Sequence, residues 1–202
     1  KPQQMREVVA ALKPLVKQQL VLSIAAGIRA ADLSRWLNGH TAIVRTMPNT
    51  PALVGKGITG AVAMGGVSAS QQQTADAILR AVGDTVWLDD EGKIDAVTAL
   101  SGSGPAYVFY FIEAMQAAAV ELGLTEAQGR QLAQATFVGA SELAVRSDEP
   151  VSVLRERVTS KGGTTYAALV SMEASGVKSA IVKALHAAAA RGKELGDEFG
   201  KD

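Results

Sequence analysis

Two adjacent glycines stand between hydroxyl residues in the stretch TSKGGTT, residues 159–165. The stretch has no acid and no histidine, and Lys161 is its only charged residue. A helical pattern begins near Thr164, and the free N–H groups at the start of a helix bind anions. The residues alone leave two interpretations open: an anion site built from backbone N–H groups and hydroxyls, or a Gly-Gly hinge followed by a threonine cap.

Three further stretches have residue types that suit a ligand site. The glycines of SGSGPAY (101–107) permit close approach to the backbone, although a plain Gly-Pro helix start explains them as well. SIAAG (23–27) and RTMPNTP (45–51) each lie at the end of a predicted strand, and open α/β sheets bind ligands beyond the carboxyl ends of their strands. The alternative for RTMPNTP is a turn made by its prolines.

The composition excludes several kinds of site. The 202 residues include no cysteine and two histidines that lie far apart, so we expect neither a thiolate nor a histidine-based metal site. The 20 basic and 20 acidic residues balance, which argues against a nucleic-acid partner. No apolar run approaches the roughly 20 residues that span a membrane, and no signal peptide is visible, so we expect a cytoplasmic protein.

The first part of the chain alternates helical and extended patterns, which predicts an α/β layer with a mostly parallel sheet. Residues 70–83 are predicted to form a helix opened by a capping box of Ser70 and Gln73. The other segments, from their hydrophobic patterns, are helices at 3–12 and 30–37 and strands at 20–27, 42–47, 59–66 and 85–90.

After about residue 91 the strand patterns end and helices follow. We predict helices at 105–123, 125–146, 164–174 and 177–195, and a short helix ending at Arg157. Thr125 and Gln128 are predicted to form the capping box of the second of these helices. Residues 105–123 are apolar almost all round, so this helix must be covered, which favours a buried subunit interface.

These stretches together resemble the pyrroline-5-carboxylate reductase family. The family's long signature, which runs from a proline to a Gly-Gly-x-Thr core and on to an acid, matches the segment from Pro150 to Glu173. SIAAGI, MPNTPALVGKG and SGSGPAYVFYFIEAM also resemble segments of that family, and the resemblance covers essentially the whole chain. One departure is Lys161, which stands where the family usually has proline.

The resemblance implies a fold that is α/β and then all-α. Residues 1–90 would be the C-terminal part of a Rossmann-type NAD(P)-binding domain, and residues 91–202 a helical domain for dimerisation and substrate binding. The family's initial βαβ unit with its glycine-rich fingerprint has no counterpart here, so we expect the printed chain to lack the first part of that domain.

The resemblance also implies an activity, which is the reduction of 1-pyrroline-5-carboxylate to L-proline with NADPH or NADH, the last step of proline synthesis. The residues do not decide between the two cofactors. The protein would form homodimers, which in this family often assemble into decamers.

Individual site residues follow from the same resemblance. Thr165 would face the ring nitrogen of the substrate, and the segment 159–165 would work with the cofactor domain of its own or of the partner subunit. The substrate's carboxylate would be held by Ser160 and by the N–H groups of Gly162, Gly163 and Thr164, with Glu91 as a further residue of the substrate pocket. The cofactor would lie against Lys1, Pro2, Ala25, Ala26, Met47 and Asn49.

Two other functions remain possible at this point. A 3-hydroxyacid dehydrogenase has a similar two-domain plan, but it places a catalytic lysine and an asparagine on the helix that here reads PAYVFYFIEAMQ, which has neither. A non-catalytic dimerisation module is the second alternative.

Overall fold

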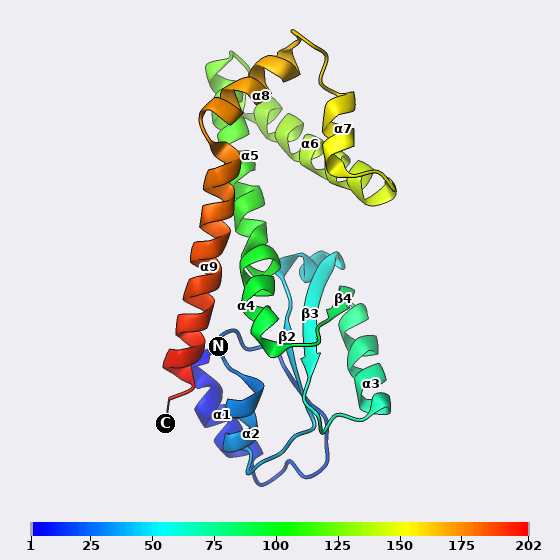
Figure 1. Ribbon diagram of the computed structural model, residues 1–202, viewed down its shortest axis with the longest axis vertical. Coiled ribbons are helices and arrows are strands. Elements are labelled where there is room, and N and C mark those ends of the chain that lie inside the picture. The colour runs from blue at the N-terminus through cyan, green and yellow to red at the C-terminus, as the bar shows by residue number, and fades with distance from the viewer. Residues whose placement is uncertain (1, 202) are drawn as a thin grey trace. The chain divides into compact units, whose positions relative to one another are not determined.

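The chain divides into two compact units in this computed structural model, which describes residues 2–201 (Figure 1). The first unit comprises the residues up to Pro105 together with those from Ala184 onward, and the second comprises Ala106–Lys183. These units do not test the predicted division into a cofactor domain, residues 1–90, and a helical domain, residues 91–202, which stays a prediction.

A four-stranded sheet forms the centre of the first unit, in the order β1 (Val21–Ser23), β2 (Ile43–Met47), β3 (Gly57–Ala63) and β4 (Gly83–Trp87). The β1–β2 and β3–β4 pairs are parallel, whereas β2 and β3 run antiparallel. The connection between β2 and β3 contains only a 3₁₀ turn, Thr50–Val54, and is shorter than the dozen or so residues that a parallel crossover needs. The sheet is therefore mixed.

Helices cover both faces of this sheet (Figure 1). On one face, Ile43 of β2 packs in a buried cluster with residues of α1 (Met5–Leu12) and α2 (Ala30–Trp36). On the other, Val44 packs with Ala75 and Leu79 of α3 (Ala69–Arg80). Successive residues of a strand point to opposite faces, so β2 separates the two cores.

Two sequence-based predictions in this unit were wrong in detail. β1 ends at Ser23 rather than at residue 27, so the residues that follow form a loop beyond the strand. The capping box of α3 uses Ser68 and Gln71 in place of the predicted pair Ser70 and Gln73, because the helix begins earlier.

A short helical segment, for which the sequence analysis named no element, follows β4. It consists of a 3₁₀ turn at Glu91–Lys93, α4 (Ile94–Val97) and a π-helical turn at Thr98–Gly102. A Cβ atom added to Gly60 of β3 would lie 2.7 Å from Val97 Cγ1, so only glycine lets α4 approach the sheet this closely.

The helices predicted for the second half are confirmed. They are α5 (Gly104–Glu121), α6 (Glu126–Arg146) with the predicted Thr125–Gln128 capping box, α7 (Val151–Arg157), α8 (Thr164–Ala174) and α9 (Val177–Phe199). The last part of α9 belongs to the first unit, where Phe199 packs against the cluster around Ile43 and Arg29 Nη2 lies 2.6 Å from Asp197 Oδ1. None of the helices within residues 2–201 combines the length and apolar character needed to cross a membrane.

Candidate active site

Four of the predicted cofactor residues, Ala25, Ala26, Met47 and Asn49, lie at one edge of the sheet. Because β1 and β2 are parallel, the loop after Ser23 and the loop after Met47 leave the sheet at the same edge. Ala25 and Ala26 lie on the first loop, and Asn49 on the second, all partly buried. Pro2 lies in a 3₁₀ turn before α1, and Lys1 is outside the described residues.

The amide of Asn49 joins the loop after β2 to its neighbours. Its Oδ1 accepts a hydrogen bond from the Ile58 N–H at 3.0 Å, and its Nδ2 lies 3.5 Å from Ser101 Oγ. Ser101 belongs to the π-helical turn, and such turns are frequent at functional sites. The sequence indicated SGSGPAY as a candidate stretch but not this contact, since residues so far apart in the chain give no local signal of pairing.

Glu91 has partners within the first unit. Its Oε1 accepts from the Ala30 N–H at 2.7 Å and from Arg45 Nη1 at 2.9 Å. The role that the resemblance implied for Glu91, in the substrate pocket, stays a prediction, although this oxygen is already used twice.

The other predicted substrate residues lie in the second unit, at the turn that leads into α8 and in the first turn of that helix. Gly162 has a φ of 74°, in the left-handed region that favours glycine, and the Gly163 N–H donates to the Ser160 carbonyl at 3.0 Å. Gly163 is the N-cap of α8, with no side chain capping the helix. From the sequence we expected the Gly163 N–H to be one of the carboxylate donors, whereas in the structure it closes the turn.

The start of α8 leaves donors that the helix itself does not use. Ala167 N–H bonds to the Gly163 carbonyl, so the N–H groups of the three residues before Ala167 precede the first helical hydrogen bond. Thr165 is half-buried in this first turn, and Thr164 and Lys161 are exposed. The turn can therefore bind an anion through backbone N–H groups, with a hydroxyl at hand to donate a further hydrogen bond.

Residues 2–201 contain no cluster of three or more acidic, histidine or cysteine side chains that could hold a metal ion. The hydrogen-bond donors among the predicted cofactor residues and the predicted substrate residues are N–H groups, amides and hydroxyls. These groups suit the binding of carboxylates and nucleotides.

A sequence profile described as pyrroline-5-carboxylate reductase dimerisation matches residues 91–195, which is more than half of the chain. The chain belongs to the pyrroline-5-carboxylate reductase family. This membership decides against the 3-hydroxyacid dehydrogenase alternative.

Relatives in the family match over nearly all of this chain. The pyrroline-5-carboxylate reductase of Pseudomonas aeruginosa is 47% identical over 202 residues, which are 100% of this chain and 74% of that protein. The enzyme of the same name from Haemophilus influenzae is 43% identical and covers 96% of this chain and 73% of its own. The resemblance noted from the sequence motifs is thus confirmed.

Solved structures of family members have the same fold. A pyrroline-5-carboxylate reductase from Coxiella burnetii has a TM-score of 0.90 at 42% identity, covering 96% of this chain and 73% of that one. The Plasmodium falciparum enzyme, solved with NADP bound, has a TM-score of 0.89 at 33% identity, covering 96% and 78%. The fold class predicted from sequence, α/β followed by all-α, is confirmed.

Proposed function

We infer that this protein reduces 1-pyrroline-5-carboxylate to L-proline by hydride transfer from NAD(P)H, the last step of proline synthesis. The observation that carries this conclusion is the 47% identity to a pyrroline-5-carboxylate reductase along the whole chain. The alternative of a non-catalytic dimerisation module has no comparable support, because the similarity also extends through residues 2–90.

NADPH or NADH would supply the hydride, and the edge of the sheet beyond β1 and β2 fits a nicotinamide. In the loop after β1, Ala25 and Ala26 have small side chains and are followed by Gly27, which has a φ of 70°. Met47 and Asn49 would flank the ring from the loop after β2, and Lys1 and Pro2 would lie on the nucleotide side. A relative solved with NADP bound supports the cofactor class.

The start of α8 would hold the carboxylate of the substrate. Ser160 and the N–H groups of Gly162 and Thr164 are the donors that we assign to it, whereas Gly163 shapes the turn by bonding to Ser160. A hydrogen bond to a charged group contributes about 1.5–3 kcal/mol net. Exposed Lys161 adds only about 0–1 kcal/mol, so the backbone dominates.

Thr165 would act at the ring nitrogen. When hydride adds to the imine carbon, the electrons of the C=N π bond move to nitrogen, which becomes a basic amine and takes a proton if the imine was neutral. A hydroxyl that donates to this nitrogen, or orders the water that does, stabilises the change and needs no strong acid.

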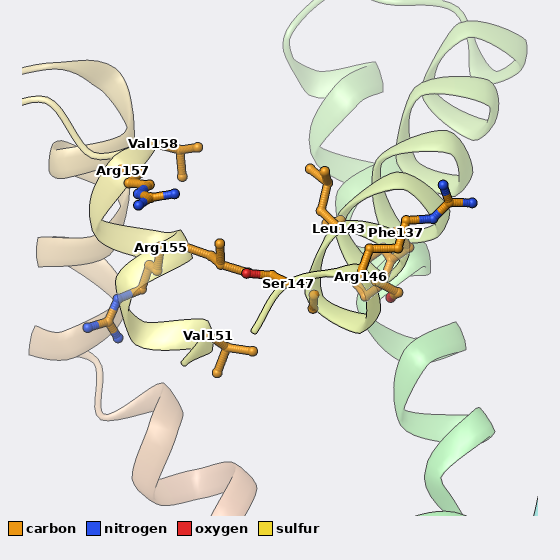
Figure 2. A pocket seen from close by; sticks show the side chains of 12 residues that line it. Phe137, Leu143, Arg146, Ser147, Val151, Arg155, Arg157 and Val158 are labelled. Atoms are coloured by element: carbon orange, nitrogen blue, oxygen red, sulfur yellow. The ribbon is translucent and has the colours of Figure 1, made fainter. Parts of the chain in front are cut away.

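A second copy of the chain would cover the apolar surfaces of the second unit. Phe109 and Tyr110 of α5 are 60% and 72% exposed, although this helix is apolar almost all round. Between α6 and α7 lies a groove of about 800 Å³, into which Leu143 and Val158 project from opposite sides (Figure 2). The family match in this region, described as dimerisation, supports self-association.

The remaining parts of the proposal concern organisation and setting. We assign residues 1–90 to the cofactor domain and 91–202 to the domain for dimerisation and substrate binding. Homodimers would assemble further, up to decamers, in the cytoplasm, with neither nucleic acid nor membrane as a partner. The balanced charge of the chain supports the exclusion of nucleic acid.

A spectrophotometric assay tests the activity. The purified protein is mixed with NADPH or NADH, and oxidation of the nicotinamide is followed after addition of 1-pyrroline-5-carboxylate, with L-proline measured as the product. Oxidation that matches proline formation mole for mole is expected. Oxidation without proline, or none with either cofactor, would overturn the proposal.

A further inference from the structure

Arg45 is a charged residue in the middle of the sheet, with a side chain that is only 5% exposed. Its Nη1 lies 2.9 Å from Glu91 Oε1, while its buried Nε has no hydrogen-bond partner among the described residues. A buried charge with an unpaired donor contributes little to the stability of a fold, since apolar side chains of similar volume often give equal or greater stability. Its presence therefore calls for another explanation.

The partner of Arg45 performs a second task at the same atom. Glu91 Oε1 also accepts the N–H of Ala30, the first residue of α2, at 2.7 Å. The N-cap residue, Arg29, makes no side-chain capping bond, so Glu91 caps α2 from a distant part of the chain. One carboxylate oxygen thus joins the start of α2 to β2.

This link connects the two loops that we assign to the nicotinamide. The loop from Ile24 to Arg29 is fixed at one end by β1 and at the other by the bond between Ala30 and Glu91. Arg45 lies two residues before Met47, on the same face of β2, and the side chain of Met47 reaches Gly102. The pair of Arg45 and Glu91 therefore joins the start of α2, where the first loop ends, to β2, which leads into the second loop.

We propose that Arg45 and Glu91 are positioning residues for the cofactor: their ion pair sets the spacing between the loop at 24–29 and the end of β2. This inference rests on the proposed function. It makes Glu91 a support of the cofactor site and removes it from the substrate pocket, where the sequence resemblance placed it.

Three substitutions separate the charge of Glu91 from its role as an acceptor. Glu91→Gln keeps an oxygen for the Ala30 N–H but loses the charge that faces Arg45. Glu91→Ala loses both. Asp89→Asn is the matched control, because it removes a carboxylate two residues away whose ion pair is with exposed Lys93.

The first measurement is hydrogen exchange at the start of α2, which needs neither cofactor nor activity. We expect the Ala30 amide to lose its protection in Glu91→Ala and to keep most of it in Glu91→Gln and Asp89→Asn. Unchanged protection in Glu91→Ala would overturn the proposal, whatever the outcome of the activity assay.

The second measurement is steady-state kinetics with each substrate varied in turn. We expect KM for the nicotinamide cofactor to rise about tenfold in Glu91→Ala, and less in Glu91→Gln, with KM for 1-pyrroline-5-carboxylate unchanged. Arg45→Lys, which keeps the charge, should be milder than Arg45→Met. A rise confined to KM for 1-pyrroline-5-carboxylate would instead identify Glu91 as a substrate ligand and overturn the proposal. If the unmodified protein shows no reductase activity, the proposed function fails and hydrogen exchange alone decides on the pair.

Discussion

The terminal methyl group of Met47 lies against the backbone of Gly102, and a Cβ atom at residue 102 would lie 2.5 Å from Met47 Cε. This contact brings the loop after β2 to the π-helical turn, where the amide of Asn49 also reaches Ser101. Two stretches that the sequence analysis treated separately, RTMPNTP and SGSGPAY, therefore meet through one apolar and one polar contact.

We expect Gly102→Ala to fold but to bind the nicotinamide cofactor more weakly. The methyl end of a methionine moves readily, so the loss in stability should be about 1 kcal/mol, the low end for overpacking. Gly83→Ala is the contrasting variant, because its Cβ would lie 2.0 Å from the Gly57 carbonyl oxygen and its φ is 147°. Denaturant unfolding and a cofactor titration check both, and equal destabilisation by the two would contradict this account.

Thr165→Val should lower kcat about 10²-fold, because the shape is kept while the proposed donor to the ring nitrogen is lost. Thr164→Val should be milder, since its N–H rather than its hydroxyl is assigned to the carboxylate. Lys161→Ala should be nearly neutral. Steady-state kinetics with circular dichroism as a check of folding decides, and a larger loss in Lys161→Ala than in Thr165→Val would point to a site based on charge.

Leu143→Glu should shift the protein toward monomers, because it places a charge in the groove between α6 and α7, where Leu143 is 69% exposed in the single chain. Ile78→Glu is the matched control, since Ile78 is 54% exposed on α3, outside the region of the dimerisation match. Light scattering at several concentrations measures the change. If Ile78→Glu dissociates the protein and Leu143→Glu does not, the groove is not the subunit contact.

The contact between Arg29 and Asp197 should make stability depend on pH in acid. The hydrogen bond from Arg29 lowers the pKa of the Asp197 carboxyl below its ordinary value of 3.8, so the unfolded chain takes up this proton more readily than the folded protein. The stabilisation is therefore present above that ordinary pKa, and it is lost as the pH falls through the lowered pKa of the folded state. Melting curves of the unmodified protein and Asp197→Asn should differ at neutral pH and converge in strong acid, and a gap that widens in acid would refute this.

Ser68→Ala should destabilise the protein by about 1 kcal/mol, the usual loss for an N-cap, because Ser68 Oγ accepts the Gln71 N–H. Ser70→Ala should cost less, because Ser70 belongs to the first turn of α3 and its hydroxyl bonds to the Ser68 hydroxyl and not to a free N–H at the helix start. Denaturant midpoints measure the two. The reverse order would favour the cap that the sequence predicted.

Local patterns predicted most elements of this fold, because helix caps and apolar runs depend on residues that are close together in the sequence. The capping box of α6 at Thr125 was predicted correctly, whereas α3 offers two serines with a glutamine three residues later, and Ser68 rather than Ser70 is the N-cap. The antiparallel pairing of β2 and β3 follows from the short connection between them, whereas hydrophobic periodicity predicts strands but not the direction in which they pair.

The candidate site could be predicted only in part, for a related reason. TSKGGTT is contiguous, so its glycines and its helix start were visible in the sequence. The contact of Glu91 with Ala30 and Arg45 joins three segments that only folding brings together, and nothing near Glu91 in the chain indicates that its carboxylate caps a distant helix.

The last helix also affects the order in which the protein can fold on the ribosome. Phe199 packs against the cluster around Ile43, and a Cβ atom at Gly27 would meet Phe199 and Leu195 at 3.2 and 3.3 Å, although residues 106–183 are synthesised in between. The first unit therefore cannot complete its core when its own strands emerge. It must wait, with one side of that core uncovered, until α9 has been translated.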